Sequence, residues 1–278
     1  MTVANRHDHW ARHATQWSNV GPPLRPGHED IAAVRKLVAK FGRDPDSRSL
    51  RALVLGVTPE LVGMDWPSGT RLAAIDRCPD MIGSLMPSTD RQGPGRVCGN
   101  WLQLPFASGS FDLIAGDGCL TVLESTADHR HFFAELARLM TVNGRLVLRL
   151  FVRPTVAETP ERVIADLQAG RIGNFHVFKW RLAMALVDEQ SGAVAVADIW
   201  QAWNDSGIVP SELSESLGWP QAQIETIEAY RGASARYTFP RLDEARAMLG
   251  VNFDELSCLI PEYELGDRCP TLLLAPQS

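Results

Sequence analysis

A short apolar strand that stops at a glycine constrains the fold of this chain more than any other feature. Residues 53–56 read Leu-Val-Leu-Gly, and Thr58 and Pro59 then supply an N-cap and a first helical position. A second apolar run, residues 72–75, leads into Asp76, 20 residues after the glycine. Such a strand, turn and helix, followed by a strand that ends in a carboxylate, are typical of the nucleotide-binding edge of an open α/β sheet. We therefore expect Asp76 to accept hydrogen bonds from ribose hydroxyl groups.

Strand and helix patterns alternate along residues 50–152 and return near the C-terminus. A helix over 127–140 has an apolar face and is followed by Asn143 and Gly144 as a stop signal. Strands are predicted at 50–55, 72–75, 96–99, 111–115, 145–152, 253–260 and 271–274. The alternation predicts an α/β fold with a Rossmann-like, mostly parallel seven-stranded sheet and helices on both faces.

A mainly helical insertion precedes the last two strands. Its helices are expected near 160–169, 175–189, 195–205, 211–217 and 220–229. An insertion at this point would lie over the carboxyl edge of the sheet, where ligands bind. We expect three parts: a helical N-terminal segment at 1–45 over the active site, a Rossmann-like domain at 46–153 and 237–278, and a helical lid at 154–236.

Composition and charge exclude several classes of function. The net charge is −6 and no run of basic residues occurs, which argues against a nucleic-acid partner. No apolar stretch reaches the roughly 20 residues of a membrane-spanning helix, and the N-terminus lacks the apolar core of a signal peptide. The 5 scattered cysteines are typical of free thiols in a reducing cytoplasm. His7, His9 and His13 lack acidic or cysteine partners at ligand spacing, so no metal is expected.

Several motifs along the sheet-forming region carry a resemblance to a known family. Over about residues 50–152 the chain resembles class I S-adenosylmethionine-dependent methyltransferases, in segments 53–61, 73–82, 99–118 and 137–150. The most specific segment is 104–112, LPFASGSFD, which resembles the family's approach to strand four. The first motif departs from the family's GxGxG pattern, because Gly56 alone is kept and the backbone has less room to approach a cofactor.

The resemblance implies S-adenosylmethionine as the cofactor and S-adenosylhomocysteine as the product. Asp76 would hold the ribose, Met81 would pack on the adenine, and Asn100 would hydrogen-bond the adenine's amino edge. The amides of the helix that starts at Pro59 would face the carboxylate of the methionine moiety, and Asp117 would lie beside the sulfonium. The residues expected to bind the cofactor are Gly56, Val57, Thr58, Asp76, Arg77, Met81, Asn100, Trp101, Asp117 and Gly118.

The acceptor side must come from the N-terminal segment, the end of the fifth strand and the insertion. Arg149 and Arg153 can clamp an acceptor carboxylate or phosphate, although pairing of Arg149 with an acid is an equal alternative. The expected catalytic residues are His176, as a base that can equally be structural, and Asp117. Aromatic residues that can line a pocket, or only the core, are Trp10, Trp17, Phe175, Trp180 and Tyr230. The residues expected to bind the acceptor are Arg149, Arg153, Trp10, Trp17 and Lys179.

Together these features predict a cytoplasmic enzyme that transfers a methyl group to a small, possibly anionic molecule by in-line displacement. A non-catalytic ligand-binding or scaffold protein with a decayed methyltransferase fold is one alternative, favoured by the altered first motif. An NAD(P)-dependent oxidoreductase is another, because Asp76 would serve a dinucleotide ribose equally well. The absence of G-x-G-x-x-G argues against it. The sequence leaves the oligomeric state open.

Overall fold

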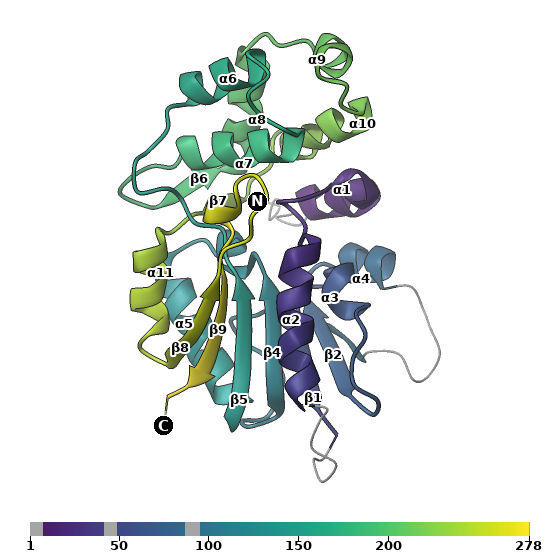
Figure 1. Cartoon of the computed structure of the whole chain (residues 1–278), viewed down its shortest axis with the longest axis vertical. Helices are drawn as coiled ribbons and strands as arrows, with labels where there is room; N and C mark the ends of the chain where they lie inside the picture. The colour runs from purple at the N-terminus through teal and green to yellow at the C-terminus, as the bar shows by residue number, and fades with distance from the viewer. Residues whose placement is uncertain (1–7, 42–48, 87–94, 278) are drawn as a thin grey trace, which may run out of the picture.

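A seven-stranded sheet forms the centre of the computed structural model, which describes residues 8–41, 49–86 and 95–277. Its strands are β1 (Arg51–Leu55), β2 (Arg71–Asp76), β3 (Gly95–Cys98), β4 (Phe111–Asp117), β5 (Met140–Arg149), β8 (Phe253–Leu259) and β9 (Thr271–Pro276). Their order is β3-β2-β1-β4-β5-β9-β8, and β9 alone runs antiparallel to its neighbours (Figure 1). The predicted fold class is confirmed.

Helices cover both faces of this sheet. One face packs against α5 (Thr126–Leu139) and α11 (Leu242–Leu249). The other face packs against α2 (His28–Phe41), α3 (Pro59–Val62) and α4 (Pro79–Leu85). Leu53 and Leu55 of β1 belong to the first layer, whereas Ala52 and Val54 belong to the second. Because successive side chains of a strand point to opposite faces, a central parallel strand must be apolar throughout. This explains the unbroken apolar run of β1.

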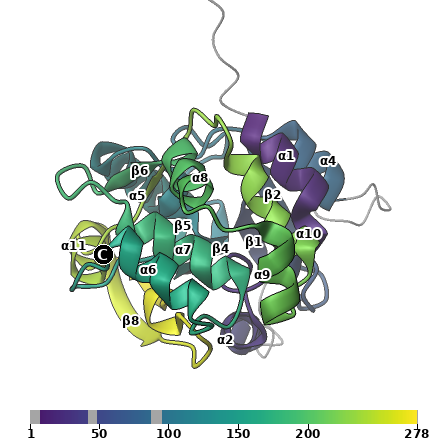
Figure 2. The ribbon, with the colours of Figure 1, turned by 90° about the horizontal axis from the view of Figure 1, so that it is seen from above.

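A second helical body, called the cap below, lies between β5 and α11 in the chain. It contains α6 (Pro160–Gln168), α7 (Phe175–Ala185), α8 (Val196–Asp205), α9 (Pro210–Leu217), α10 (Gln221–Ile224), the 3₁₀ helix η3 (Glu225–Tyr230) and the two-stranded sheet of β6 (Ala193–Ala195) and β7 (Arg236–Thr238). The cap has its own hydrophobic core. It stands over the carboxyl ends of the parallel strands (Figures 1 and 2). Sequence patterns missed β6 and β7, because three residues are too few to show a strand period.

The N-terminal helix α1 (Asp8–Gln16) lies beside the cap and packs against α4 and η3 (Figure 1). The 3₁₀ helix η1 (Trp17–Asn19) continues it toward α2. Two further 3₁₀ helices follow strand β4 and precede strand β9, η2 (Cys119–Val122) and η4 (Gly266–Arg268). Across the three described ranges, no helix combines the length and apolar character needed to cross a membrane.

The boundary between α5 and β5 differs from the sequence-based expectation. The helix ends at Leu139 and the strand begins at once with Met140, so Asn143 and Gly144 lie inside β5 and not at a helix stop. The pairing of β4 with β5 shifts register between Phe111 and Leu113. The prediction was wrong here because an irregular strand contains the same turn-favouring residues as a helix end.

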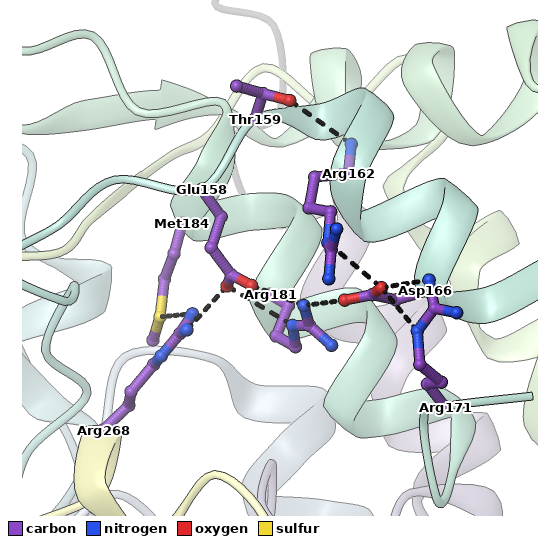
Figure 3. Close-up of polar contacts among 8 residues, drawn as sticks. All are labelled: Glu158, Thr159, Arg162, Asp166, Arg171, Arg181, Met184 and Arg268. Atoms are coloured by element: carbon purple, nitrogen blue, oxygen red, sulfur yellow. Dashed lines mark hydrogen bonds and ion pairs between the residues drawn. The ribbon is translucent and has the colours of Figure 1, made fainter. Parts of the chain in front are cut away.

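A network of ion pairs joins the cap to the sheet (Figure 3). Arg181 of α7 donates to Glu158 and, at 2.7 Å, to Asp166 of α6. Arg268 of η4 donates to the same Glu158 at 2.6 Å. Hydrogen bonds from Arg181 and Arg171 lower the pKa of Asp166 to about 2, so this carboxylate stays ionised at physiological pH. The shared carboxylates connect two cap helices with the segment that leads into β9.

Candidate active site

The turn after β1 brings three of the expected cofactor residues together. Gly56 has a φ of +85°, a left-handed conformation that favours glycine. Its N–H donates to the carbonyl of Ile75 at 2.8 Å. A Cβ atom at Gly56 would lie 3.7 Å from the Trp101 ring and 3.8 Å from Oδ2 of Asp76. A single glycine therefore gives the close backbone approach at this turn.

Local hydrogen bonds fix the residues at the ends of β2 and β3, beside this turn. Oδ1 of Asp76 accepts from the backbone N–H of Cys78 at 2.8 Å. The indole N–H of Trp101 donates to the carbonyl of Ile75 at 3.0 Å, next to the Gly56 bond. Oδ1 of Asn100 accepts from its neighbour's backbone, the N–H of Leu102, at 3.1 Å. The side chains around Gly56 are thus held in place by backbone groups.

One cavity is lined by every residue expected to bind the cofactor. From the sheet edge it is lined by Leu55, Gly56, Val57, Thr58, Asp76, Arg77, Cys78, Met81, Asn100, Trp101, Asp117 and Gly118. The same cavity continues beneath the cap and α1, where most of the lining is aromatic or apolar. These residues are Trp10, His13, Trp17, Val20, Leu24, Thr121, Val122, Leu123, Phe151, Trp180, Tyr230 and Tyr237. We call the first set the cofactor half and the second set the aromatic half.

The helix after Gly56 is short. It is the single turn α3, and the side chain of Thr58 makes no capping hydrogen bond. The N–H groups of Leu61 and Val62 both donate to the carbonyl of Thr58. A single turn aligns too few peptide dipoles to form a strong anion site. The helix nevertheless begins at Pro59 with Thr58 at its N-cap, as expected, and Val57 and Thr58 line the cavity.

Comparison of the sequence with known proteins gives matches to methyltransferases. Residues 57–148 match the family described as "Methyltransferase domain". The demethylmenaquinone methyltransferase of Mycobacterium sp. (strain JLS) is 26% identical over 199 residues, which are 68% of this chain and 81% of that protein. The chain thus contains a methyltransferase domain of the class I, S-adenosylmethionine-dependent kind. Its cofactor is S-adenosylmethionine, and this sets aside the oxidoreductase and the non-catalytic alternatives.

Solved structures share the fold of this methyltransferase. The N-methyltransferase NodS from Bradyrhizobium japonicum WM9, solved with S-adenosyl-L-homocysteine, superposes with a TM-score of 0.55 at 13% identity, covering 99% of this chain and 100% of that chain. A Rhodobacter sphaeroides protein described as a Zn-dependent alcohol dehydrogenase superposes with a TM-score of 0.65 at 12% identity, covering 99% and 100%. At such low identity the likeness concerns the fold alone.

The cofactor half of the methyltransferase suits S-adenosylmethionine, which supplies an electrophilic methyl group on a sulfonium. Asp76 at the end of β2 presents a carboxylate beside the Gly56 turn, as a ribose partner requires. Met81 and Trp101 add apolar surface for a flat base. The individual binding roles of these residues remain predictions, since the cavity places the residues together without a ligand to define each contact.

Asp117 lines the cavity, but Arg149 does not. Nε of Arg149 donates to Oδ1 of Asp117 at 2.6 Å, and both of its terminal nitrogens donate to the carbonyl of Pro23 at 3.0 Å. Nη1 also donates to the Tyr263 hydroxyl at 3.2 Å. Burial raises the pKa of Asp117, and the charge of Arg149 opposes this shift. Arg149 is therefore an internal partner of Asp117, and its expected role as an acceptor clamp was wrong.

Arg153 is also absent from the cavity lining. Its guanidinium donates to Glu189 and to Glu244, each at 3.2 Å. Both carboxylates lie near the base of the cap, with side chains 59% and 41% exposed. The expected contact of Arg153 with an acceptor is corrected, because its charge is already compensated at this junction.

His176 and Lys179 of α7 are buried behind the cavity and do not line it. Nε2 of His176 hydrogen-bonds the carbonyl of Asn19 at 3.0 Å, and burial together with the charge of Lys179 lowers its pKa to about 3. The ammonium of Lys179 donates to the Thr226 hydroxyl at 2.8 Å, and burial lowers its pKa to about 7. His176 thus anchors the N-terminal segment, and its placement as a base at the acceptor was wrong.

The aromatic half confirms part of the expected pocket and adds to it. Trp10, Trp17, Trp180 and Tyr230 line the cavity, whereas Phe175 packs within the cap core. Sequence reasoning missed the roles of Phe151, Tyr237 and His13. Two signals were available. Phe151 lies two residues beyond Arg149, the last residue of the fifth strand, and His13 lies three residues after Trp10 on the same helix face.

Proposed function

We propose that this methyltransferase transfers the methyl group of S-adenosylmethionine to an uncharged, aromatic small molecule. The observation that supports the proposal is the continuity of one cavity from the cofactor half into the aromatic half. Six aromatic side chains line the second half: Trp10, Trp17, Phe151, Trp180, Tyr230 and Tyr237. Aromatic surfaces favour flat rings through stacked and edge-to-face contacts. The curated relatives, named for demethylmenaquinone, support an aromatic acceptor of this class.

The charges of the cavity lining support an uncharged acceptor. Among the described residues that line the cavity, Arg77 is the one lysine or arginine, and it belongs to the cofactor half. Both arginines once expected to bind an anion are absent from the cavity lining and are paired with carboxylates. A carboxylate or phosphate in the aromatic half would lose its hydration without gaining a guanidinium. The net charge of −6 likewise supports a small molecule over a nucleic acid.

We also propose that different parts of the chain bind the cofactor and the acceptor. The sheet domain, 46–153 with 237–278, would bind the cofactor, while the N-terminal segment 1–45 and the lid 154–236 would bind the acceptor. Trp10 of α1, Trp180 of α7 and Tyr230 of η3 line the aromatic half and support this division. The boundary at 45–46 lies outside the described residues.

In this arrangement the protein accelerates transfer mainly by positioning and by excluding water. The cavity walls hold an acceptor ring in the aromatic half, facing the cofactor half where Gly118 and Asp117 end β4. An in-line displacement needs the acceptor atom and the methyl group aligned at close distance. The apolar walls also strip water from the acceptor atom, which strengthens its electrostatic interactions.

The test compares two acceptors of the same ring size. Purified protein is incubated with S-adenosylmethionine labelled in its methyl group and with either naphthol or naphthoic acid. We expect label in naphthol, and none above background in naphthoic acid. Calorimetric titration with S-adenosylhomocysteine verifies that the cofactor half is intact. Label in naphthoic acid alone, or in neither compound despite S-adenosylhomocysteine binding, would overturn the proposed acceptor class.

A further inference from the structure

We propose that His13 is the catalytic base that takes the acceptor's proton, and that the acceptor is an aromatic hydroxyl compound. Methylation would occur on the hydroxyl oxygen or on a ring carbon that this oxygen activates. The inference rests on the proposed function and narrows its acceptor class. It follows from the position of His13 in the cavity and from its unpartnered ring nitrogen.

The side chain of His13 lines the aromatic half although it is 5% exposed. Its Nε2 atom is buried and has no hydrogen-bond partner. Buried polar atoms are nearly always paired in folded proteins, so an unpaired one in a cavity wall points to a missing ligand group. A hydroxyl group on the acceptor would pair with this nitrogen.

A continuous wall of rings connects His13 with the cofactor half. The wall begins at Gly118, where a Cβ atom would lie 2.6 Å from the Phe151 ring, so glycine is required for this contact. The following ring centroids are separated by 5.1 Å for Phe151–Trp180, 5.6 Å for Trp180–Tyr237, 5.8 Å for Tyr237–Tyr230 and 5.4 Å for Tyr230–His13. All these side chains line the same cavity. The wall therefore runs from the cofactor half to His13 through four successive ring contacts.

His13 is in the protonation state that a base requires. Burial lowers the pKa of His13 well below its ordinary value, and the charges of Lys179, His9 and Arg12 act in the same direction. The imidazole is therefore neutral at physiological pH. Asp80 of α4, the helix that packs against α1, is exposed. The titratable and charged groups near His13 are His9 and Arg12 of α1, Lys179 of α7, and Tyr230 of η3, whose ring in turn contacts Tyr237 of β7.

The reaction keeps the charge of the cavity constant. A bond forms between the methyl carbon and the acceptor oxygen or ring carbon, and the sulfur–methyl bond breaks with its electron pair going to sulfur. One positive charge is thereby lost at the sulfonium. The proton released by the acceptor moves to Nε2 of His13, which gains one positive charge. The neutral imidazole thus accepts the proton that the acceptor releases, as a general base does.

Lys179 offers a rival explanation, because a buried cation also stabilises an acceptor anion. Its ammonium lies 5.1 Å from the centre of the Tyr230 ring, and Lys179 does not belong to the cavity lining. A variant at each position separates the two explanations. His13→Gln keeps a hydrogen-bonding group near the position of Nε2 but cannot take a proton. Lys179→Met removes the buried charge and keeps an apolar chain of similar length.

The experiment uses para-nitrophenol, whose ionised form is recognised by its absorption. The phenol is added to wild type, His13→Gln and Lys179→Met, each saturated with S-adenosylhomocysteine, below the pH at which the free phenol ionises. We expect the phenolate spectrum with wild type and with Lys179→Met, because the opposite charge of a bound phenolate stabilises the imidazolium and offsets the effect of burial on the pKa of His13. With His13→Gln we expect binding within about threefold of wild type but the spectrum of the neutral phenol. Calorimetry with S-adenosylhomocysteine confirms that the variants are folded.

Kinetics provide the second measurement. We expect His13→Gln to lower kcat for a hydroxylated acceptor by about 100-fold or more with little change in KM, as for loss of a general base. Added imidazole should restore activity to His13→Ala. The inference is overturned if His13→Gln still binds the phenolate, or if loss of the phenolate follows Lys179→Met instead. If wild type binds S-adenosylhomocysteine but methylates no aromatic acceptor, the proposed function fails as well.

Discussion

Replacing Arg149 by methionine is expected to destabilise the protein far more than replacing Arg153 by methionine. The two arginines lie near the end of the same strand, and their side chains are 4% and 7% exposed. Their partners differ. Asp117 is 8% exposed, whereas Glu189 and Glu244 are 59% and 41% exposed. The two substitutions therefore compare the stability lost when the carboxylate partner is buried with the stability lost when the partners are exposed.

The magnitudes follow from what each substitution leaves behind. Without Arg149, the carboxylate of Asp117 stays buried near the equally buried Asp30, and the Pro23 carbonyl loses two donors. Removing one partner of a buried ion pair costs about 3–5 kcal/mol. Without Arg153, both glutamates regain water, and exposed ion pairs are worth about 0–1 kcal/mol. We therefore expect a difference of about 3 kcal/mol between the variants.

Urea denaturation followed by tryptophan fluorescence gives the two unfolding free energies, and thermal melts provide an independent measure. For Arg149→Met a fall in Tm of about 6–20 °C is expected, since 1 kcal/mol corresponds to about 2–4 °C in proteins of this size. For Arg153→Met the fall should stay below about 4 °C. Equal losses in the two variants, or an Arg149→Met variant as stable as wild type, would refute the assignment of Arg149 as the internal partner of Asp117.

Three further predictions concern the cofactor half and the buried lysine. Asp76→Ala should weaken S-adenosylhomocysteine binding by about 1–3 kcal/mol through loss of a hydrogen-bonded carboxylate, measured by calorimetry; unchanged affinity would remove Asp76 from the site. Gly56→Ala should also weaken this binding and lower Tm, because its φ of +85° strains any other residue; an alanine variant with wild-type affinity would contradict the close-approach argument. Burial lowers the pKa of Lys179 to about 7, so the unfolded chain binds more protons than the folded one above that pH. Wild-type stability should therefore rise from pH 7 to pH 9 by up to about 1.4 kcal/mol per pH unit, and Lys179→Met should lack this rise in urea denaturation.

The cofactor half could be predicted from the sequence because its residues are local to strand ends. Gly56, Asp76 and Asp117 each end or follow an apolar run, and parallel strands bring their carboxyl ends to one edge. Strand period and turn residues therefore place them together without knowledge of the rest of the fold. The short helix α3 is the exception, since its length depends on packing and not on the Thr58-Pro59 signal.

The aromatic half could not be predicted in the same way, because residues far apart in the chain form it. Whether the side chain of Arg149 faces the cavity depends on partners at Pro23 and Tyr263, which are 126 and 114 residues away. The same holds for His176, whose partner Asn19 is 157 residues away. Lone polar residues in apolar surroundings show that a partner must exist, but they do not show whether it is a ligand or a backbone carbonyl.

The buried side chains of His176 and Arg149 bind the same backbone segment, residues 17–25. His176 bonds the carbonyl of Asn19, Arg149 bonds that of Pro23, and Arg25 in turn donates to Glu60 at 2.7 Å. Backbone carbonyls carry no side-chain identity, so sequence patterns cannot reveal such anchors. Because residues 17–25 are held from the cap, from β5 and from α3, they fix where α1 lies and hence where Trp10 and His13 enter the cavity. Substitutions at these anchors should therefore alter acceptor binding, although no anchor lines the cavity itself.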